Sequence, residues 1–230
     1  MQSHWQWLRG QQIKLSQMGS KILVVSDKVA DELYNDGKQN SLRDISFIIS
    51  AGDLPYYYLE YLVSIFNIPL YFVRGNHAKF YESEKGVVHD HPWGCYDLHV
   101  RSLKDPSGFL LAGVQGCHVY NYGPYQYSQS TMWRFVFRLV PSLMANFALS
   151  GRYLDIFVTH SPPWKIHDDQ KDRAHQGIKA FLWVLKVFKP RYHFHGHVYD
   201  FRKETQMITT FENTEIINTY GYRTHEVFLP

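Results

Sequence analysis

Five short polar side chains, each placed just after a predicted strand, have the types that divalent metal sites use. They are Asp27, Asp53, Asn76, His160 and His197. Imidazole nitrogens suit ions such as Zn or Fe, whereas carboxylate and amide oxygens suit Mn or Mg. A carboxylate can bridge two such ions, and ions about 3.5–4 Å apart can clamp the oxygens of a phosphate ester during hydrolysis. The pattern therefore indicates metal-dependent chemistry.

Each of these residues also has an ordinary structural interpretation. An Asp after Gly, such as Asp53, is most often a turn residue or a helix cap, and a lone His at a strand end is most often a hydrogen-bonded structural residue. Five such positions in order, each at a strand end, favour the metal site. Glycine precedes Asp53, Asn76 and His197, which lets the chain turn sharply and bring a short side chain close to a ligand.

The elements that must position these residues alternate between short apolar runs and helical stretches, as in stacked βαβ units. The predicted strands are 21–25, 45–50, 70–73, 155–159 and 191–195, with two more in the tail at 206–210 and 215–218. The predicted helices are 56–66, 131–149 and 176–188. Residues 96–100 and 109–114 are expected to pair across a turn at 105–108, and 79–93 to form a long loop. Because ligands bind beyond the carboxyl ends of parallel strands, the five polar side chains could meet in one crevice.

Composition limits the class of protein. The chain has 230 residues, 45% of them hydrophobic, and a formal net charge of +3, which suits one α/β domain. No run of about 18 apolar residues predicts a membrane span, and the scattered basic residues give no strong nucleic-acid signal. Cys95 and Cys117 are expected to be reduced thiols, and the start lacks the apolar middle region of a signal peptide. We expect a cytoplasmic protein with an N-terminal extension over residues 1–20 and a single domain over 21–230.

In its ordered motifs the sequence resembles the calcineurin-like metallophosphoesterase superfamily, in the form of a small bacterial-type phosphoesterase. The pattern of that family is D-x-H, then G-D, then G-N-H-D/E, then a lone His, then G-H-x-H. The matching stretches are Asp27-Lys28-Val29, Gly52-Asp53, Gly75-Asn76-His77-Ala78, His160 and Gly196-His197-Val198-Tyr199. The resemblance runs from about Lys21 to the end, and Gly-Asn-His with a later Gly-His is specific in combination.

The resemblance implies a fold, a cofactor and a set of roles. The fold would be a four-layer α/β/β/α sandwich of the α/β class, with two mixed sheets flanked by helices. The cofactor would be a divalent ion (Mn, Fe, Zn or Mg). Asp53 would bridge two ions, and Asp27 would ligate the first. Asn76, His160 and His197 would complete the ligand set of the second ion. His77 would stabilise or protonate the leaving oxygen while a metal-activated water attacks phosphorus.

Three departures from the family pattern weaken one half of this centre. Val29 and Tyr199 replace histidines that would ligate the first ion, and Ala78 replaces an acidic residue. The second half is intact, so the resemblance predicts one complete site and one doubtful, carboxylate-rich site. His195 could reach the metal region if its strand continues to His197, although a buried, hydrogen-bonded His is the commoner outcome.

Several other residues could lie beside the site or contact the substrate. They are Lys28, His167, Asp168, His175 and Tyr199. The commoner outcome for a lysine is solvation, and Asp172, in the same loop as His167, could cap a helix. Aromatic residues at 56–58 and 120–127 are usually core or groove lining, but they could stack a planar group of the substrate.

Two functions remain open from the sequence. The first is a phosphatase or phosphodiesterase that acts on a small phosphate ester, with a nucleotide-like substrate as one option. The second is a metal- or nucleotide-binding scaffold that kept the fold but lost turnover. The replacement of two metal-ligating histidines by Val29 and Tyr199 favours this scaffold. The presence of His77 argues against it, because a scaffold needs no group that acts on the leaving oxygen. Residues 52–58 lack the Asp and Arg of the protein Ser/Thr phosphatase motif G-D-x-x-D-R-G, which argues against that subclass. No membrane partner is expected, and the sequence leaves the oligomeric state open.

Overall fold

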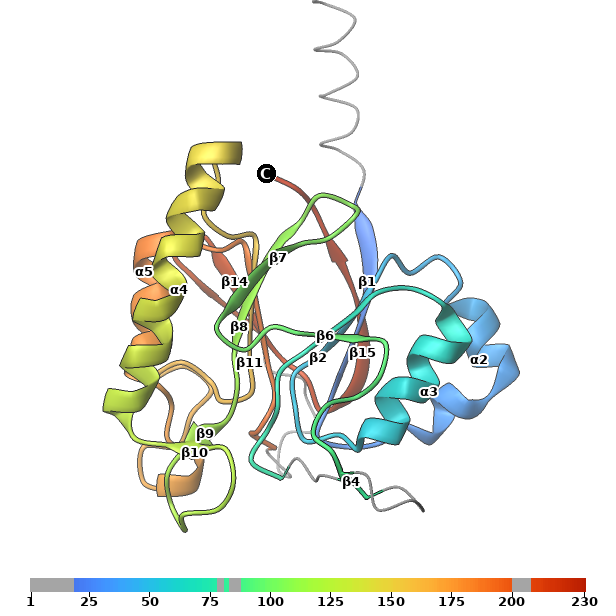
Figure 1. Ribbon diagram of the computed structural model, residues 1–230, viewed down its shortest axis with the longest axis horizontal. Helices are drawn as coiled ribbons and strands as arrows, with labels where there is room; N and C mark the ends of the chain where they lie inside the picture. The colour runs from blue at the N-terminus through green and yellow to red at the C-terminus, as the bar shows by residue number, and fades with distance from the viewer. Residues whose placement is uncertain (1–18, 78–80, 83–87, 200–207) are drawn as a thin grey trace, which may run out of the picture.

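Two stacked β-sheets with helices on both outer sides make up the protein in the computed structural model (Figure 1). The structure describes residues 19–77, 81–82, 88–199 and 208–230. The order of layers is helix, sheet, sheet, helix, because each sheet buries one face against the other sheet and one against helices.

The first sheet has five strands in the order β15-β1-β2-β3-β6. Its strands are β1 (Ser20–Ser26), β2 (Ile48–Ser50), β3 (Leu70–Phe72), β6 (Cys95–Asp97) and β15 (Gly221–Val227). β15 runs antiparallel to β1, and the other neighbours are parallel. The 3-10 turn η1 (Asp31–Tyr34) and helix α3 (Tyr56–Phe66) pack on its outer face, with the short helix α2 (Asp36–Ser41) beside them.

The second sheet has six strands in the order β13-β14-β12-β11-β8-β7. Its strands are β7 (Arg101–Lys104), β8 (Leu110–Val114), β11 (Ile156–Thr159), β12 (Tyr192–His195), β13 (Ile208–Phe211) and β14 (Thr214–Asn218). The four inner strands are parallel, and the edge strands β7 and β13 are antiparallel. Helices α4 (Gln129–Ser150) and α5 (Lys179–Phe188) cover its outer face.

Smaller elements connect these layers. The pairs β4 (Tyr81–Glu82) with β5 (Val88–His89) and β9 (Cys117–His118) with β10 (Gln126–Tyr127) form two-stranded sheets, and the 3-10 turn η2 (Arg173–His175) precedes α5.

Strand β1 shows how the sequence produces the layers. Ile22 and Val24 point into the core between the sheets, whereas Leu23 and Val25 point into the core beneath α3. Side chains alternate along a strand, so only a continuous apolar run can fill both cores. The predicted four-layer arrangement with two mixed sheets is confirmed, and helix α3 has the predicted bounds.

The predicted strand pairing of 96–100 with 109–114 is wrong, apart from an isolated parallel bridge between His99 and Gly113. Residues 95–97 join the first sheet beside β3, and the partner of β8 is β7. The backbone of Val100 is left-handed, with φ 55°, which breaks the strand and lets the chain pass from one sheet to the other. The turn that follows β7 closes directly, since Asp105 N donates to Phe109 O at 2.9 Å.

The elements that were not predicted from the sequence are η1, η2 and α2 and the strands β4, β5, β7, β9, β10 and β15. Several predictions fall wholly or partly outside the described residues. They concern residues 1–18 of the extension, position 78, residues 79–80 and 83–87 of the loop at 79–93, and residues 206–207 of the tail strand. Within the described parts of that loop, β4 and β5 form a short pair. None of the helices in the described residues has the length and apolar character needed to cross a membrane.

Candidate metal centre

Four donor atoms from the two sheets meet beyond the carboxyl ends of β2, β3, β11 and β12. The Nε2 atom of His160 lies 3.2 Å from Asp53 Oδ2, 3.1 Å from Asn76 Oδ1 and 3.1 Å from His197 Nδ1. The ligand atoms of Asp53, His160 and His197 all lie within 4.8 Å of one another. Among the described His, Cys, Asp and Glu residues, these three form the one group compact enough to hold an ion.

Both histidines present a lone pair to this group. His160 Nδ1 lies 2.8 Å from the carbonyl oxygen of Ala51, and His197 Nε2 lies 2.7 Å from that of Ala174. A carbonyl oxygen can only accept, so each of these nitrogens carries the ring proton. The opposite nitrogens, His160 Nε2 and His197 Nδ1, are therefore the atoms that would ligate an ion. Such outer contacts orient the histidines of metal sites.

Two glycines allow the loops to approach this closely. A Cβ atom on Gly75 would collide with the carboxylate of Asp53, and one on Gly196 would collide with the side chains of Ser26 and Asp27. The glycines that precede Asn76 and His197 in the sequence are therefore required by the packing of the site.

The backbones of three site residues are left-handed. The φ angles are 63° at Asp27, 57° at Asp53 and 68° at His197. A non-glycine residue in this region costs about 1–2 kcal/mol, and such residues gather at functional sites. The strand ends are thus turned away from their ladders so that these side chains point into one crevice.

Charge is concentrated at the buried His160–Asp53 pair. Burial alone would lower the pKa of His160, but the Asp53 carboxylate and, after it, Asp27 raise it to about 9. Burial opposes ionisation of Asp53 too, but His160 and the amide of His77 lower its pKa to about 2. Burial beside His160 lowers the pKa of His197 to about 3, which keeps its ring neutral.

A divalent cation fits this arrangement. The lone pairs of Asp53, Asn76 and His197 converge on His160 Nε2, so positive charge is needed where they meet. A proton on His160 supplies it in the absence of an ion, and a metal ion would replace that proton. The donor set of two imidazoles, one carboxylate and one amide oxygen suits a borderline ion such as Zn, Fe or Mn.

The half of the site around Asp27 is poorer in ligands. Asp27 Oδ2 accepts hydrogen bonds from Ser26 Oγ at 2.7 Å and from His197 N at 3.0 Å. Burial raises the pKa of this carboxyl group. Val29 packs against the apolar core beneath α3, and the ring of Tyr199 stacks on Tyr220 with centroids 4.1 Å apart. Neither residue supplies an imidazole at Asp27.

A pocket of about 440 Å³ opens over the centre. Its lining residues are Asp27, Asp53, Asn76, His77, Tyr120, Ala174, His175, His197 and Tyr220. His77 is exposed here, and its backbone N–H donates to Asp53 Oδ1 at 2.7 Å. His175 pairs with Asp172 at 2.5 Å and lies with its ring 5.2 Å from that of His197. Asp172 also caps η2, by accepting from Ala174 N, as the simpler interpretation of that residue predicts.

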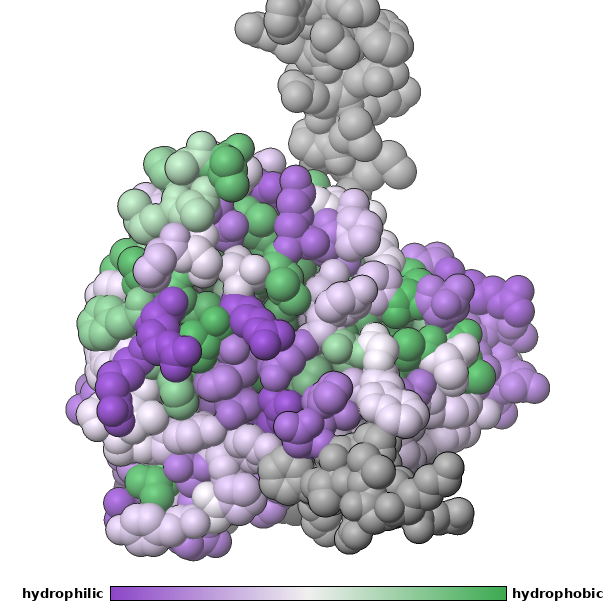
Figure 2. All heavy atoms as spheres, viewed as in Figure 1, coloured by the Kyte–Doolittle hydropathy of each residue, from purple (hydrophilic) through white to green (hydrophobic). Residues whose placement is uncertain are grey.

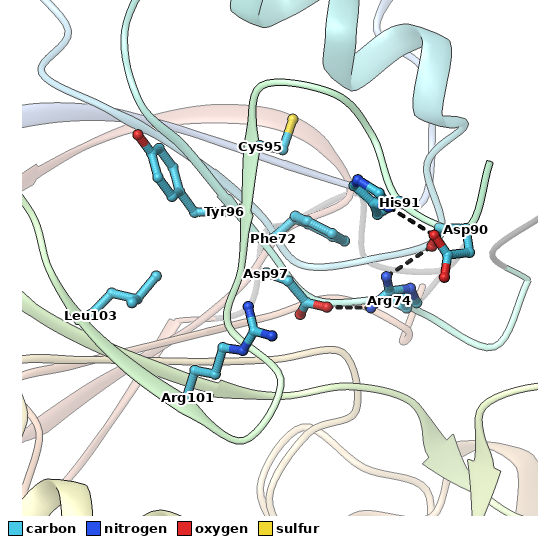
Figure 3. A pocket seen from close by; sticks show the side chains of 9 residues that line it. All are labelled: Phe72, Arg74, Asp90, His91, Cys95, Tyr96, Asp97, Arg101 and Leu103. Carbon is cyan, nitrogen blue, oxygen red and sulfur yellow. Dashed lines mark hydrogen bonds and ion pairs between the residues drawn. The ribbon is translucent and has the colours of Figure 1, made fainter.

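Arg74 anchors the end of β3 that carries Asn76 and His77. Its guanidinium donates to Asp97 Oδ2 at 2.6 Å and to the carbonyl oxygen of Asp90 at 2.8 Å. Figure 3 shows these bonds at the wall of a second pocket, of about 420 Å³. The guanidinium is thus fully engaged in holding the loop.

His195 and His167 do not reach the metal centre. His195 Nε2 lies 2.9 Å from His167 Nδ1, and its Nδ1 lies 2.9 Å from the carbonyl oxygen of Gly196. His167 Nε2 lies 2.7 Å from Thr209 Oγ1. His195 is therefore a buried, hydrogen-bonded residue, as its simpler interpretation predicts. The reason is that β12 ends at His195, so the alternation of side chains does not continue to His197.

Two further candidates lie away from the pocket lining. Lys28 is exposed, and Asp168 accepts a hydrogen bond from Gly177 N at 2.9 Å, which orders its own loop. Tyr58, from the predicted aromatic patch at 56–58, is part of the core beneath α3.

Ser26 and Tyr220 were not predicted from the sequence as site residues, and Tyr120 was given no individual role. Asn76 Nδ2 donates to the hydroxyl of Tyr120 at 3.1 Å, which leaves its carbonyl oxygen facing His160. Ser26 is the last residue of β1 and Tyr220 lies shortly after β14, and these positions at the carboxyl ends of strands are the signal that could have identified them.

The chain matches a known family in sequence and known structures in fold. A model of the calcineurin-like phosphoesterase family matches residues 21–201. No curated protein sequence matches the chain significantly. The fold is similar to the crystal structure of TT1561 from Thermus thermophilus, with a TM-score of 0.56, 14% identity and coverage of 92% of this chain and 99% of that one. It is also similar to GAP50, the anchor in the inner membrane complex of Plasmodium, with a TM-score of 0.52, 12% identity and coverage of 91% and 81%.

Proposed function

The chain belongs to the calcineurin-like phosphoesterase family, and on that basis we propose that it hydrolyses a small phosphate ester with a metal-activated water. The observation that carries the proposal is the convergence of Asp53, Asn76, His160 and His197 on one point. A metal-binding scaffold could keep the same donor set, and the exposed His77 in the pocket above it is what favours turnover.

The four converging residues would hold one divalent ion. Such an ion supplies Lewis acidity and lowers the pKa of a bound water to about 7. The carbonyl oxygens of Ala51 and Ala174 fix the two imidazole tautomers, and the Tyr120 hydroxyl fixes the amide of Asn76. The protein therefore presents the donors in ligating orientation before any ion binds.

His77 is the residue proposed to act on the leaving group. Its backbone is tied to Asp53 Oδ1, and its side chain is exposed in the pocket. From that position it would donate a proton or hydrogen bond to the departing oxygen of the ester. The rings of Tyr120 and Tyr220 at the pocket wall would contact the remainder of the substrate, which favours a substrate with a planar group.

The centre is proposed to be asymmetric, with one strong ion and one weak ion. Asp27 and Asp53 are the protein ligands left for the weaker ion, and both are carboxylates, which suits Mn or Mg. A metal-binding scaffold without turnover is the second candidate, and the positions of Val29 and Tyr199 are what favours it.

The cytoplasmic location stays a prediction. Cys95 and Cys117 form no disulfide, which is compatible with a reducing compartment.

Hydrolysis assays separate the two candidates. We would measure p-nitrophenyl phosphate and bis-p-nitrophenyl phosphate hydrolysis with added Mn, for the wild type and for Asp53→Asn and His77→Ala. The phosphoesterase predicts turnover that falls by about 10²-fold or more in both variants, with unchanged metal content in His77→Ala. Absence of turnover with every divalent metal tried, or turnover that both substitutions leave unchanged, would establish the scaffold instead.

A further inference from the structure

Helices α4 and α5 expose a series of large apolar side chains to solvent. The exposed fractions are 55% at Phe137, 50% at Met144, 45% at Phe147, 87% at Leu149 and 46% at Val187. Figure 2 shows the apolar colour gathered over the end of α4 at the upper left. Single exposed apolar side chains are ordinary, but a continuous exposed apolar surface indicates an interaction site.

Aromatic contacts join the two helices into one surface, here called the α4/α5 face (residues 133–149 and 179–187). The ring centroids of Trp133 and Phe137 lie 5.4 Å apart. Trp183 on α5 lies 5.6 Å from Trp133 and 5.7 Å from Phe137. Contacts of this kind stabilise a pair of rings beyond their burial, so the three rings act as one surface rather than as independent side chains.

Every charged residue of the two helices is basic. Those residues are Arg134, Arg138, Lys179 and Lys186, and neither 129–150 nor 179–188 contains Asp or Glu. Within the described parts of the chain, no carboxylate forms an ion pair with any of the four. Lys179 and Lys186 instead lie over the rings of Trp164 and Phe211. The face is therefore apolar, aromatic and positively charged.

The positive charge of the α4/α5 face distinguishes between the partners that could bind to it. Two copies of the chain joined through the same face would bring Arg134 and Arg138 of each copy toward those of the other, and like charges repel. An anionic surface would neutralise them. Apolar and aromatic side chains beside lysines and arginines, without acids, are the composition of helices that lie in the interface of a negatively charged bilayer.

We propose that the α4/α5 face binds peripherally to the surface of an anionic lipid bilayer, with Phe137, Met144 and Leu149 entering the headgroup region. The expectation of no membrane partner came from the lack of a spanning segment, and such a segment is not needed for binding at the surface. The binding requires neither a metal ion nor turnover, so it stands apart from the proposed hydrolysis.

Vesicle sedimentation of the full-length protein tests this proposal. We would use phosphatidylcholine vesicles with and without about 30% phosphatidylglycerol, at low and high NaCl. The expected result is sedimentation with the anionic vesicles that weakens as salt rises, and little with the neutral ones. Equal binding to both vesicle types, or none to either, would overturn the proposal. This experiment uses only the wild-type protein, so its result does not depend on whether a variant folds.

Paired variants locate the surface. Arg134→Gln with Arg138→Gln should lower the partition coefficient by about 30-fold, at about 1 kcal/mol per charge, and Phe137→Ser with Leu149→Ser by at least about 10-fold. The matched controls are Arg43→Gln with Lys104→Gln, and Tyr57→Ser with Ile65→Ser on α3, all at exposed positions. They should bind within about twofold of the wild type. If the controls lose as much binding as the α4 variants, the face is not the binding surface; a dimer abolished by Phe137→Ser would identify a second copy as the occupant.

Discussion

The Nε2 atom of His160 and the Nδ1 atom of His197 face each other at 3.1 Å. Both rings already donate their other N–H to a backbone carbonyl, of Ala51 and Ala174 respectively. Two lone pairs at this distance repel unless a positive charge lies between or beside them. The contact is therefore stable only with a proton on His160 or with a cation in the centre, and these two exclude each other.

Metal affinity should consequently rise with pH. The pKa of His160 is about 9 without metal, so below that pH each ion must displace one proton. The apparent Mn association constant should increase by about tenfold per pH unit between pH 7 and 8.5 and level off above about 9. Calorimetric titration at several pH values measures this slope. A constant affinity across the range would mean that His160 is already neutral.

A methyl group at Gly75 should destroy the centre without unfolding the protein. The Cβ atom of Gly75→Ala would collide with the Asp53 carboxylate, which must then move away from His160. We expect the metal affinity to fall by at least about 10²-fold. Loss of a contact that supports a metal ligand already costs up to about 10²-fold, and here a ligand itself is displaced. Metal content after dialysis gives the measurement.

Gly151→Ala is the matched control for that substitution. Gly151, unlike Gly75, has a left-handed backbone, with φ 71°, and a Cβ there meets nothing within 4 Å. It should cost about 1 kcal/mol of stability and leave metal content unchanged. Equal metal content in both variants would show that the tight approach of Gly75 to Asp53 is irrelevant to binding.

Restoring the two missing imidazoles should strengthen the weak half of the site. The double variant Val29→His with Tyr199→His places histidines at the family's positions beside Asp27. We expect elemental analysis to change from about one Mn per chain toward two, because imidazole adds to a site that now offers carboxylates. A ratio that stays at one would indicate that the backbone around Asp27 no longer admits a second ion.

Removal of His167 should affect stability and not metal binding. His167→Ala leaves the buried Nε2 atom of His195 without its partner, and such a loss costs about 1–3 kcal/mol. Denaturant unfolding should show this decrease, while the Mn affinity stays within about twofold. If the affinity falls and the stability does not, His167 belongs to the metal centre after all.

The sequence predicted most of what brings the ligands together. Asp27, Asp53 and His160 follow continuous apolar runs, and such runs are typical of strands buried on both faces. Parallel strands place their carboxyl ends at one edge, so their last residues identify the crevice even without coordinates. The helix at 56–66 was equally clear, because Pro55 precedes it and apolar residues recur along it.

The rest depended on backbone geometry that residue types do not reveal. Val100 takes a left-handed conformation, although β-branched residues avoid it, and this moves 96–97 into the other sheet. β15 lies at the sheet edge, and between its two buried end residues every side chain is exposed or partly exposed, so it lacks the apolar run of a central strand. The chain also turns after His195, so that His195 points away from His197 although only Gly196 separates them.

Anomalous diffraction from crystals grown with Mn tests the central claim most directly. We predict one strong peak within bonding distance of Asp53, Asn76, His160 Nε2 and His197 Nδ1, and a weaker or missing peak beside Asp27. No peak among those four donors, or two peaks of equal occupancy, would contradict the asymmetric metal centre proposed for this protein.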